Sequence, residues 1–254
     1  MTTQQFLTSP EGRKLAYVYT PGRHPAVVFL GGFMSDMQGS KACDLEAWAV
    51  AQGRAFLRFD YSGHGASEGE FTDGTISAWV ADAVAVIKAH FDTPVVLVGS
   101  SMGGWISLLL AQRQTVPIAG LLGIAAAPDF TEDSMWAEMS QAQRDEVIQN
   151  GIVYLPSDYD APYPISKNLL LDGRNNLVLR QPLALPFPAR FLHGMADRDV
   201  TMDRPLAIMD HAAGADMHLT FVKDADHRFS TPKELILIRQ TVADILAAVA
   251  QDAQ

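Results

Sequence analysis

The sequence predicts an α/β domain in which helices cover a mostly parallel sheet. Short apolar runs alternate with amphipathic stretches, and 254 residues suit one such domain with an insertion. The central runs are continuous in Val, Leu, Phe and Ala, as in strands buried on both faces. The expected strands are residues 14–19, 26–30, 55–60, 94–99, 118–126, 189–193 and 218–222.

Five helices are expected between or after these strands. Apolar residues recur at helical spacing along 76–87, which predicts an amphipathic helix there. The last helix begins with Thr231 as N-cap, Pro232 at the first helical position and Glu234 completing a capping box. The expected helices are residues 40–52, 75–90, 102–112, 203–213 and 232–249.

One long stretch interrupts this alternation. A helix-like piece at 140–150 starts with a Ser-x-x-Gln cap and ends at Gly151, and six prolines follow before residue 189. A structureless loop of this length is improbable in a compact domain. We therefore expect residues 129–188 to form a small cap insertion over the functional site, with 1–128 and 189–254 as the core domain. A surface insertion without a role is the alternative.

The composition narrows the class of protein. Hydrophobic residues make up 48% and charged residues 19%, which is ordinary for a globular domain, and the net charge of −10 argues against nucleic acid as a partner. The single cysteine allows neither an intrachain disulfide nor a metal site of clustered cysteines. No cofactor and no metal are expected.

The sequence also predicts a cytoplasmic location. The start, MTTQQFLTSPEGRK, lacks an apolar segment behind a basic one, as a secretory signal would have, and it is not rich in arginine. The longest apolar runs are too short to span a bilayer. Stable membrane insertion is therefore not expected.

A candidate nucleophile lies between an apolar strand and a helical pattern. The string Gly99-Ser100-Ser101-Met102-Gly103 matches Gly-x-Ser-x-Gly. In a nucleophile elbow the sharp turn forces the serine into a strained conformation, and small residues two positions either side allow it. We therefore predict Ser101 as the nucleophile. A glycine-rich turn with a capping serine is the alternative, and Ser100 is the next candidate.

A serine hydroxyl needs a base, and the chain has seven histidines. Only His227 lies in a loop after the last strand and before the last helix, where it could stand above the nucleophile. His64, in the glycine-rich string Ser62-Gly63-His64-Gly65, is a weaker alternative.

The base in turn needs an orienting carboxylate, in the chain order serine, acid, histidine. The loop after the strand at 189–193 offers two acids, of which Asp197 is the expected partner and Asp199 the alternative. Asp129 is a third option, because it follows the strand that ends near Ala126.

Two backbone amides are expected to form an oxyanion hole. The amide of Met102 lies at a helix N-terminus, and Gly31-Gly32 let the chain approach the substrate so that the amide of Phe33 can donate. A plain glycine turn is the alternative at 31–32. A substrate pocket is expected from Met34, Trp105, Met135, Trp136 and Met139, although these residues could instead attach the cap to the core.

Several strings resemble one known family. They are Gly31-Gly32-Phe33-Met34-Ser35, Gly39-Ser40-Lys41-Ala42, Arg58-Phe59-Asp60-Tyr61-Ser62-Gly63, Gly99-Ser100-Ser101-Met102-Gly103-Gly104-Trp105, Leu192-His193-Gly194-Met195 and Asp226-His227-Arg228. The chain is similar along most of its length to the α/β-hydrolase domain-containing group, which includes a mitochondrial acyl-protein thioesterase also described as a mycophenolic acid acyl-glucuronide esterase.

The resemblance implies an α/β-hydrolase fold with Ser101, Asp197 and His227 in the catalytic roles. It also implies hydrolysis of S-acyl or O-acyl bonds without a cofactor. A small-molecule ester or thioester is the expected substrate, with an acylated protein as a further option. The alternatives are a non-catalytic ligand-binding protein on the same fold and, ranked last, an amidase or peptidase.

Overall fold

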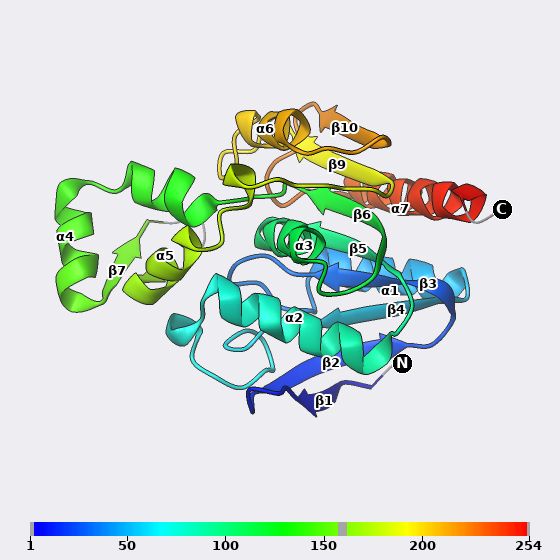
Figure 1. Ribbon diagram of the computed structural model, residues 1–254, viewed down its shortest axis with the longest axis horizontal. Helices are drawn as coiled ribbons and strands as arrows, with labels where there is room; N and C mark the ends of the chain where they lie inside the picture. The colour runs from blue at the N-terminus through cyan, green and yellow to red at the C-terminus, as the bar shows by residue number, and fades with distance from the viewer. Residues whose placement is uncertain (1–2, 157–161, 253–254) are drawn as a thin grey trace.

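The computed structural model describes residues 3–156 and 162–252 and is organised around one eight-stranded sheet (Figure 1). The strand order is β1-β2-β4-β3-β5-β6-β9-β10, and all neighbours are parallel except β1 with β2 and β2 with β4. The strands are β1 Gln5–Thr8, β2 Lys14–Thr20, β3 Arg23–Leu30, β4 Arg54–Phe59, β5 Val95–Ser100, β6 Ile118–Ile124, β9 Ala189–Gly194 and β10 Met217–Val222.

Helices cover both faces of this sheet (Figure 1). One apolar cluster joins α1 and α7 to one face, and a second joins α2, α3 and α6 to the other. The bounds are α1 Ser40–Ala51, η1 Phe71–Asp73, α2 Ile76–His90, α3 Met102–Arg113, α6 Asp203–His211 and α7 Pro232–Asp252. The predicted mostly parallel α/β architecture is confirmed.

All seven expected strands and all five expected helices are present, with small shifts at their ends. The sequence analysis missed β1, a four-residue strand at the antiparallel edge of the sheet, because so short and exposed a segment carries little periodicity. The capping interaction at α7 is present, since the Glu234 carboxylate accepts the amide of Thr231 at 2.8 Å. Among the described residues, no helix is long and apolar enough to cross a membrane.

The parallel register brings several strand ends to one edge of the sheet. Leu30 of β3 is paired with Gly99 of β5, Gly99 with Gly123 of β6, and Gly123 with Phe191 of β9. Loops that leave these strands therefore start at the same level. In open α/β sheets this carboxyl edge is where ligands bind.

The segment between β6 and β9 forms most of a separate group at one end of the molecule (Figure 1). Among the described residues, its strands β7 and β8 pair only with each other. Helix α4 begins with the predicted capping box at Ser140 and has Gly151 as its C-cap. A small apolar cluster of its own includes Val147, Val153 and Ile165. The elements are η2 Thr131–Trp136, α4 Gln141–Asn150, β7 Ile152–Leu155, β8 Tyr163–Ser166, α5 Lys167–Arg174 and η3 Val178–Arg180. We call residues 129–188 the insertion.

Asp129 ties the two ends of the insertion together. Its fully buried carboxylate accepts the amides of Val178 at 2.7 Å and Leu179 at 3.0 Å and pairs with Arg180 at 2.7 Å. Burial raises the pKa of Asp129, although these donors oppose the rise. The side chain that the sequence analysis weighed as an alternative catalytic acid therefore holds the insertion.

A second carboxylate connects the insertion to the core. Asp133 in η2 pairs with Arg180 and, at 2.6 Å, with Arg204 of α6. Burial disfavours the ionised form, but the hydrogen bonds from both arginines outweigh it, so the pKa of Asp133 is lowered. A lowered pKa means that the folded state gains stability from this group at neutral pH and loses it as the pH falls through that pKa.

We expect Asp133→Asn to lower the free energy of unfolding at neutral pH by about 1–3 kcal/mol, because charged hydrogen-bond partners are lost. The difference from wild type should shrink in acid, where Asp133 is protonated in both states. Thermal unfolding between neutral and acidic pH measures it. Asp145→Asn on the exposed face of α4 is the matched control, and an equal effect there would contradict the prediction.

Candidate active site

Ser101 occupies a strained turn between β5 and α3. Its φ of 53° and ψ of −116° lie in a region that residues with a side chain rarely adopt. Backbone hydrogen bonds hold this conformation: the Ser101 amide donates to the carbonyl of Ile124 at 2.9 Å, and its carbonyl accepts the amides of Gly104 at 2.9 Å and Ala127 at 3.1 Å, among others. The turn is thus fixed by the neighbouring strand β6 and by the start of α3.

The two glycines of the motif are required by close packing. A Cβ on Gly99 would lie 2.3 Å from the carbonyl oxygen of Gly103, and a Cβ on Gly103 would lie 2.1 Å from that of Leu30. Neither distance is sterically possible for a side chain. The pattern therefore reflects how closely the start of α3 packs against the ends of β5 and β3.

Ser101, His227 and Asp197 form a hydrogen-bonded line. The Ser101 hydroxyl donates to His227 Nε2 across 3.1 Å, and His227 Nδ1 donates to Asp197 Oδ2 across 2.8 Å. The residues come from the loops after β5, β10 and β9, so the fold joins positions 30 to 126 residues apart. Such a line can move a proton from a hydroxyl to an imidazole while a carboxylate stabilises the resulting imidazolium.

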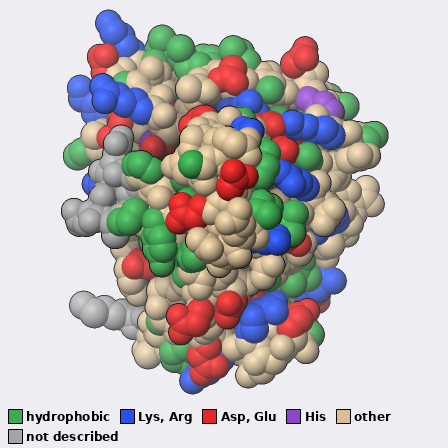
Figure 2. Space-filling view, turned by 90° about the vertical axis from the view of Figure 1, so that its left-hand side faces the viewer, with side chains coloured by type: hydrophobic (Ala, Val, Ile, Leu, Met, Phe, Trp, Pro, Cys, Tyr) green, Lys and Arg blue, Asp and Glu red, His purple; other side chains and the backbone are tan. Residues whose placement is uncertain are grey.

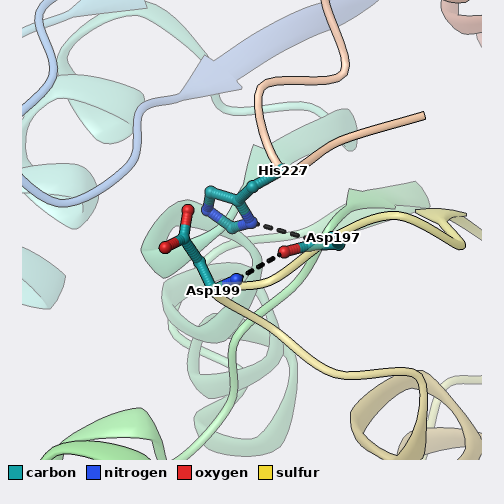
Figure 3. Close-up of side chains that lie close together, drawn as sticks. All are labelled: Asp197, Asp199 and His227. Carbon is teal, nitrogen blue, oxygen red and sulfur yellow. Dashed lines mark hydrogen bonds and ion pairs between the residues drawn. The ribbon is translucent and has the colours of Figure 1, made fainter. Parts of the chain in front are cut away.

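The Asp197 carboxylate is fully buried but well satisfied. Its Oδ1 accepts the amides of Asp199 at 2.9 Å and Val200 at 2.8 Å, which leaves Oδ2 for the imidazole (Figure 3). These donors satisfy the hydrogen-bonding capacity of a buried carboxylate oxygen. They also fix the direction in which its second oxygen points.

His193, at the end of β9, supports the same loop. Its Nε2 donates to the carbonyl of Val200 at 2.9 Å and lies 3.8 Å from Asp197 Oδ2. Burial lowers the pKa of His193, so its ring stays neutral near neutral pH. A neutral donor here shapes the loop without adding a charge beside the acid.

Asp199 lies beside the imidazole but is more exposed than Asp197 (Figure 3). It contacts the acid through its backbone amide, which donates to Asp197 Oδ1. Asp197, Asp199 and His227 together have ligand atoms within 4.8 Å of one another and could hold a cation. A cation on His227 would compete for a ring nitrogen that now bonds Ser101 or Asp197, so the metal-free reading stays our prediction.

The structure places the other candidates differently. His64 is buried among the rings of Tyr61, Phe71 and Trp79, and burial lowers its pKa. Ser100 ends β5 and lines the same cleft as Ser101, but the hydrogen bond to His227 comes from Ser101.

The loop after β3 brings the Phe33 amide to the nucleophile. A Cβ on Gly32 would lie 3.4 Å from the Cβ of Ser101, so this loop passes directly beside the serine. Within the described ranges, the Phe33 amide donates no backbone hydrogen bond. The amide of Met102 lies in the first turn of α3, where amides lack helical partners. Both amides are therefore available to an oxyanion beside Ser101.

Packing and buried charges hold this loop in place. The Phe33 ring packs edge-to-face against Phe71 of the core, with the ring centroids 4.9 Å apart. It packs in the same way against Phe130 and Tyr163 of the insertion, with centroid distances of 5.7 Å. Further along, Asp60 accepts the amide of Met37 at 2.6 Å.

Arg58 completes that clamp on the loop. It donates to the Met37 carbonyl at 2.7 Å and pairs with Glu46 of α1 at 2.8 Å. Burial raises the pKa of Asp60, although the amides of Ala66 and Met37 oppose the rise. Two residues of the string 58–63, Arg58 and Asp60, therefore have a structural role, because they fix the loop that contains Phe33.

Ser101 and His227 open into a cleft of about 1000 Å³, at the upper end of the usual range for ligand sites. Figure 2 looks onto the insertion end of the molecule, where apolar side chains lie between acidic and basic ones. The apolar lining comes mainly from the insertion and the loop after β3: Phe33, Met34, Phe130, Met135, Met139, Leu155 and Tyr163. The polar lining comes mainly from the start of α1 and the loops around 199 and 229.

Three of the five expected pocket residues, Met34, Met135 and Met139, line the cleft, and two do not. Trp105 is fully buried in α3, where its indole donates to the carbonyl of Asn176 at 3.0 Å. Trp136 packs under the guanidinium groups of Arg144 and Arg174. Both tryptophans attach the insertion or stabilise it, which is the alternative that their sequence pattern allowed.

The sequence analysis missed most of the polar lining. Ser40 and Lys41 begin α1, and Thr201 and Ser230 lie in two distant loops. Nothing in the spacing of single polar residues predicts that they share a cleft. The string at 39–42 carried the one available signal, because it stood among the motifs of the family resemblance.

The fold and this site define an α/β-hydrolase. The family model described as serine aminopeptidase, S33, matches residues 23–174, and the chain belongs to this hydrolase family. The protein is therefore a hydrolytic enzyme.

Relatives cover nearly the whole chain. Palmitoyl-protein thioesterase ABHD10, mitochondrial, of Rattus norvegicus is 32% identical over 96% of this chain and 83% of its own length. The structure of mouse ABHD10 is 30% identical with a TM-score of 0.88, covering 96% of this chain and 98% of that one. A crystal structure from Agrobacterium vitis S4 is 36% identical with a TM-score of 0.92, covering 96% and 99%.

We expect Asp197→Asn to reduce turnover by orders of magnitude, about 10⁴-fold as in the best-studied triad, because the amide favours the wrong imidazole tautomer. Asp199→Asn, the matched control two residues further along the same loop, should reduce turnover far less. Turnover of a chromogenic ester by the two variants measures this. The reverse ranking would give the role to Asp199, and two mild effects would contradict a carboxylate from this loop as the partner of His227.

Proposed function

We propose that this enzyme hydrolyses carboxylic esters or thioesters with Ser101 as nucleophile, His227 as general base and Asp197 as the orienting acid. The observation that carries the proposal is the hydrogen-bonded line from the buried Asp197 carboxylate through His227 to the Ser101 hydroxyl. The strained backbone of Ser101 supports it, because strain persists where the surrounding structure enforces it and is concentrated at active sites.

The proposed reaction proceeds through an acyl-enzyme. Ser101 Oγ attacks the acyl carbon while His227 Nε2 takes its proton, and the amides of Phe33 and Met102 hold the developing oxyanion. His227 then protonates the leaving alcohol or thiol as the bond to the acyl carbon breaks. Water repeats the sequence on the acyl-enzyme and releases the acid. Each oxyanion donor is worth roughly 3 kcal/mol in the transition state.

The acyl group is proposed to lie along the apolar lining supplied by the insertion, which would then act as a cap. Methionines 34, 135 and 139 suit a pocket that accepts chains of different length, since methionine is flexible and polarisable. Met34 is 44% exposed at a positive φ of 54°, so it stands at the cleft rather than in the core. The polar lining near α1 is left for the leaving group.

The names of the relatives favour a thioester of a protein as one substrate. The ABHD10 proteins are named palmitoyl-protein thioesterases, and they align with nearly all of this chain. We therefore place S-acylated proteins beside small esters in the proposed substrate range. The matching family is described as an aminopeptidase, so a peptide or amide substrate is the second candidate.

For location, the cytoplasm stays our prediction from the sequence, whereas the ABHD10 relatives are named mitochondrial. Fractionation of cells that express the full chain distinguishes the two. The absence of nucleic acid among its partners follows from charge alone and is likewise kept as a prediction.

Ser101→Ala should abolish turnover and covalent labelling by a fluorophosphonate probe while the thermal midpoint stays close to that of wild type. The hydroxyl is lost but the strained turn keeps its backbone hydrogen bonds. Ser100→Ala is the matched control and should still label. Labelling of Ser101→Ala at the wild-type rate would remove the assignment, and an unlabelled wild type would favour a ligand-binding protein.

We expect kcat/KM to rise several-fold for each two carbons added to the acyl chain, until the chain outgrows the cleft. Each buried methylene contributes about 0.8 kcal/mol. Matched series of p-nitrophenyl esters and acyl thioesters, with one amide of the same acyl group, measure the trend. Acetyl substrates should be poor and the optimum should fall at medium length. A flat or falling series would place selectivity on the leaving-group side.

A further inference from the structure

Lys41 connects the start of α1 to the loop that carries His227. Its side chain is partly buried, and Nζ donates a short hydrogen bond to the carbonyl of Arg228, the residue after the histidine. The two residues are 187 positions apart. Lys41 therefore makes a polar contact between α1 and the backbone of the residue that follows His227.

The histidine loop needs such a contact because its own conformation is demanding. Phe229 is fully buried with a positive φ of 47°. Local hydrogen bonds shape it: Asp226 accepts the amide of Phe229 at 3.2 Å, and Glu234 accepts that of Thr231 at 2.8 Å. These two bonds lie within the loop and α7, and the buried Phe229 shares an apolar cluster with Ala42 and Leu45 of α1. Apolar packing has little directional preference, so a directed polar contact from α1 adds a constraint on the loop backbone.

The helix that carries Lys41 directly follows the loop that supplies the Phe33 amide. It is also pinned to α7, since Arg239 pairs with Asp44 at 3.0 Å. Lys41 therefore connects two loops whose positions around Ser101 matter. The loop after β3 carries the Phe33 amide, and the loop after β10 carries His227.

The surroundings of Lys41 disfavour its charge. Burial lowers the pKa of Lys41 to about 8, although the carboxylates of Asp226 and Glu234 attract the ammonium, and the Arg228 guanidinium adds to the lowering. Charged groups held at such a cost are concentrated at functional sites. An apolar side chain would fill the same space without that cost.

We propose that Lys41 is a positioning residue whose ammonium holds the Arg228 carbonyl and thereby fixes His227 relative to Ser101 and the Phe33 amide. This inference rests on the proposed hydrolytic role of His227. A charge-assisted hydrogen bond is roughly twice as strong as a neutral one, so the protonated amine holds the carbonyl best. The alternative is that Lys41, which also lines the cleft, binds the substrate directly.

Three variants separate these roles. Lys41→Met keeps the length and removes the donor, Lys41→Arg keeps a permanent cation, and Lys233→Met is the matched control at an exposed lysine near the start of α7. The measurements are the labelling rate with a small fluorophosphonate, kcat and KM with one ester, the thermal midpoint, and the NMR signal of the His227 Nδ1 proton.

For Lys41→Met we expect labelling and kcat to fall about ten- to a hundred-fold, as displacements near 1 Å cost at an active site, with KM unchanged. The thermal midpoint should stay at or above that of wild type, because a disfavoured charge is removed. The Nδ1 proton signal should shift. Lys41→Arg should recover much of the rate, and Lys233→Met should match wild type.

The pH dependence gives a further readout. Wild-type labelling should decline above about pH 8 as Lys41 loses its proton, and Lys41→Arg should lack that decline. Between about 8 and the ordinary value of 10.5 the unfolded chain keeps a proton that the folded protein has lost, so the cost of this group to the stability of the folded state falls as pH rises. The thermal midpoint of wild type should accordingly rise relative to that of Lys41→Met as the pH increases above 8.

Several outcomes would overturn the positioning role. They are a raised KM with unchanged kcat, an unshifted Nδ1 signal, or an alkaline decline that persists in Lys41→Arg. The proton signal does not depend on turnover. An inactive, unlabelled wild type would therefore refute the proposed function, whereas a signal that is the same in wild type and Lys41→Met would refute this inference.

Discussion

The left-handed turn at Ser101 is the constraint on which the rest of the site depends. A residue with a side chain holds a φ of 53° only if its neighbours enforce it, and here the end of β6 does so through the carbonyl of Ile124 and the loop after it through the amide of Ala127. The same turn requires α3 to start so close to β3 that Gly103 has no room for a Cβ beside Leu30. Strain in one residue is thus sustained by three parallel strands and the helix between them.

The parallel sheet also explains why distant residues can meet at that turn. The ends of β3, β5, β6 and β9 are level, so the loop that carries Phe33 and the loop that carries Asp197 leave the sheet on either side of Ser101. β10 lies beyond β9 at the edge of the sheet. His227 reaches the serine only because its loop runs back over the strand ends, and the buried Phe229 anchors that return.

Buried polar groups hold each of these loops, and each has partners. Asp60 accepts the amide of Met37 and Arg58 donates to its carbonyl. Asp197 accepts hydrogen bonds from two amides and an imidazole. Leaving such groups unpaired would be costly, so every loop has one arrangement that satisfies its buried charge. The insertion follows the same principle, because Asp129 and Asp133 connect its ends to each other and to α6. Precision at Ser101 therefore comes from electrostatics in the loops as much as from apolar packing under the sheet.

The fold class and most elements follow from the amino-acid sequence, because strands buried on both faces and amphipathic helices have patterns that can be recognised locally. The sequence also singled out Ser101, His227 and Asp197, since the elbow pattern and the chain order of the three residues are local or topological. It did not distinguish a tryptophan that lines a cleft from one that packs an insertion, as Trp105 and Trp136 show. The roles of Asp129 in holding the insertion and of Lys41 in contacting the histidine loop became visible in the folded chain, because partners 49 to 187 residues away leave no local pattern.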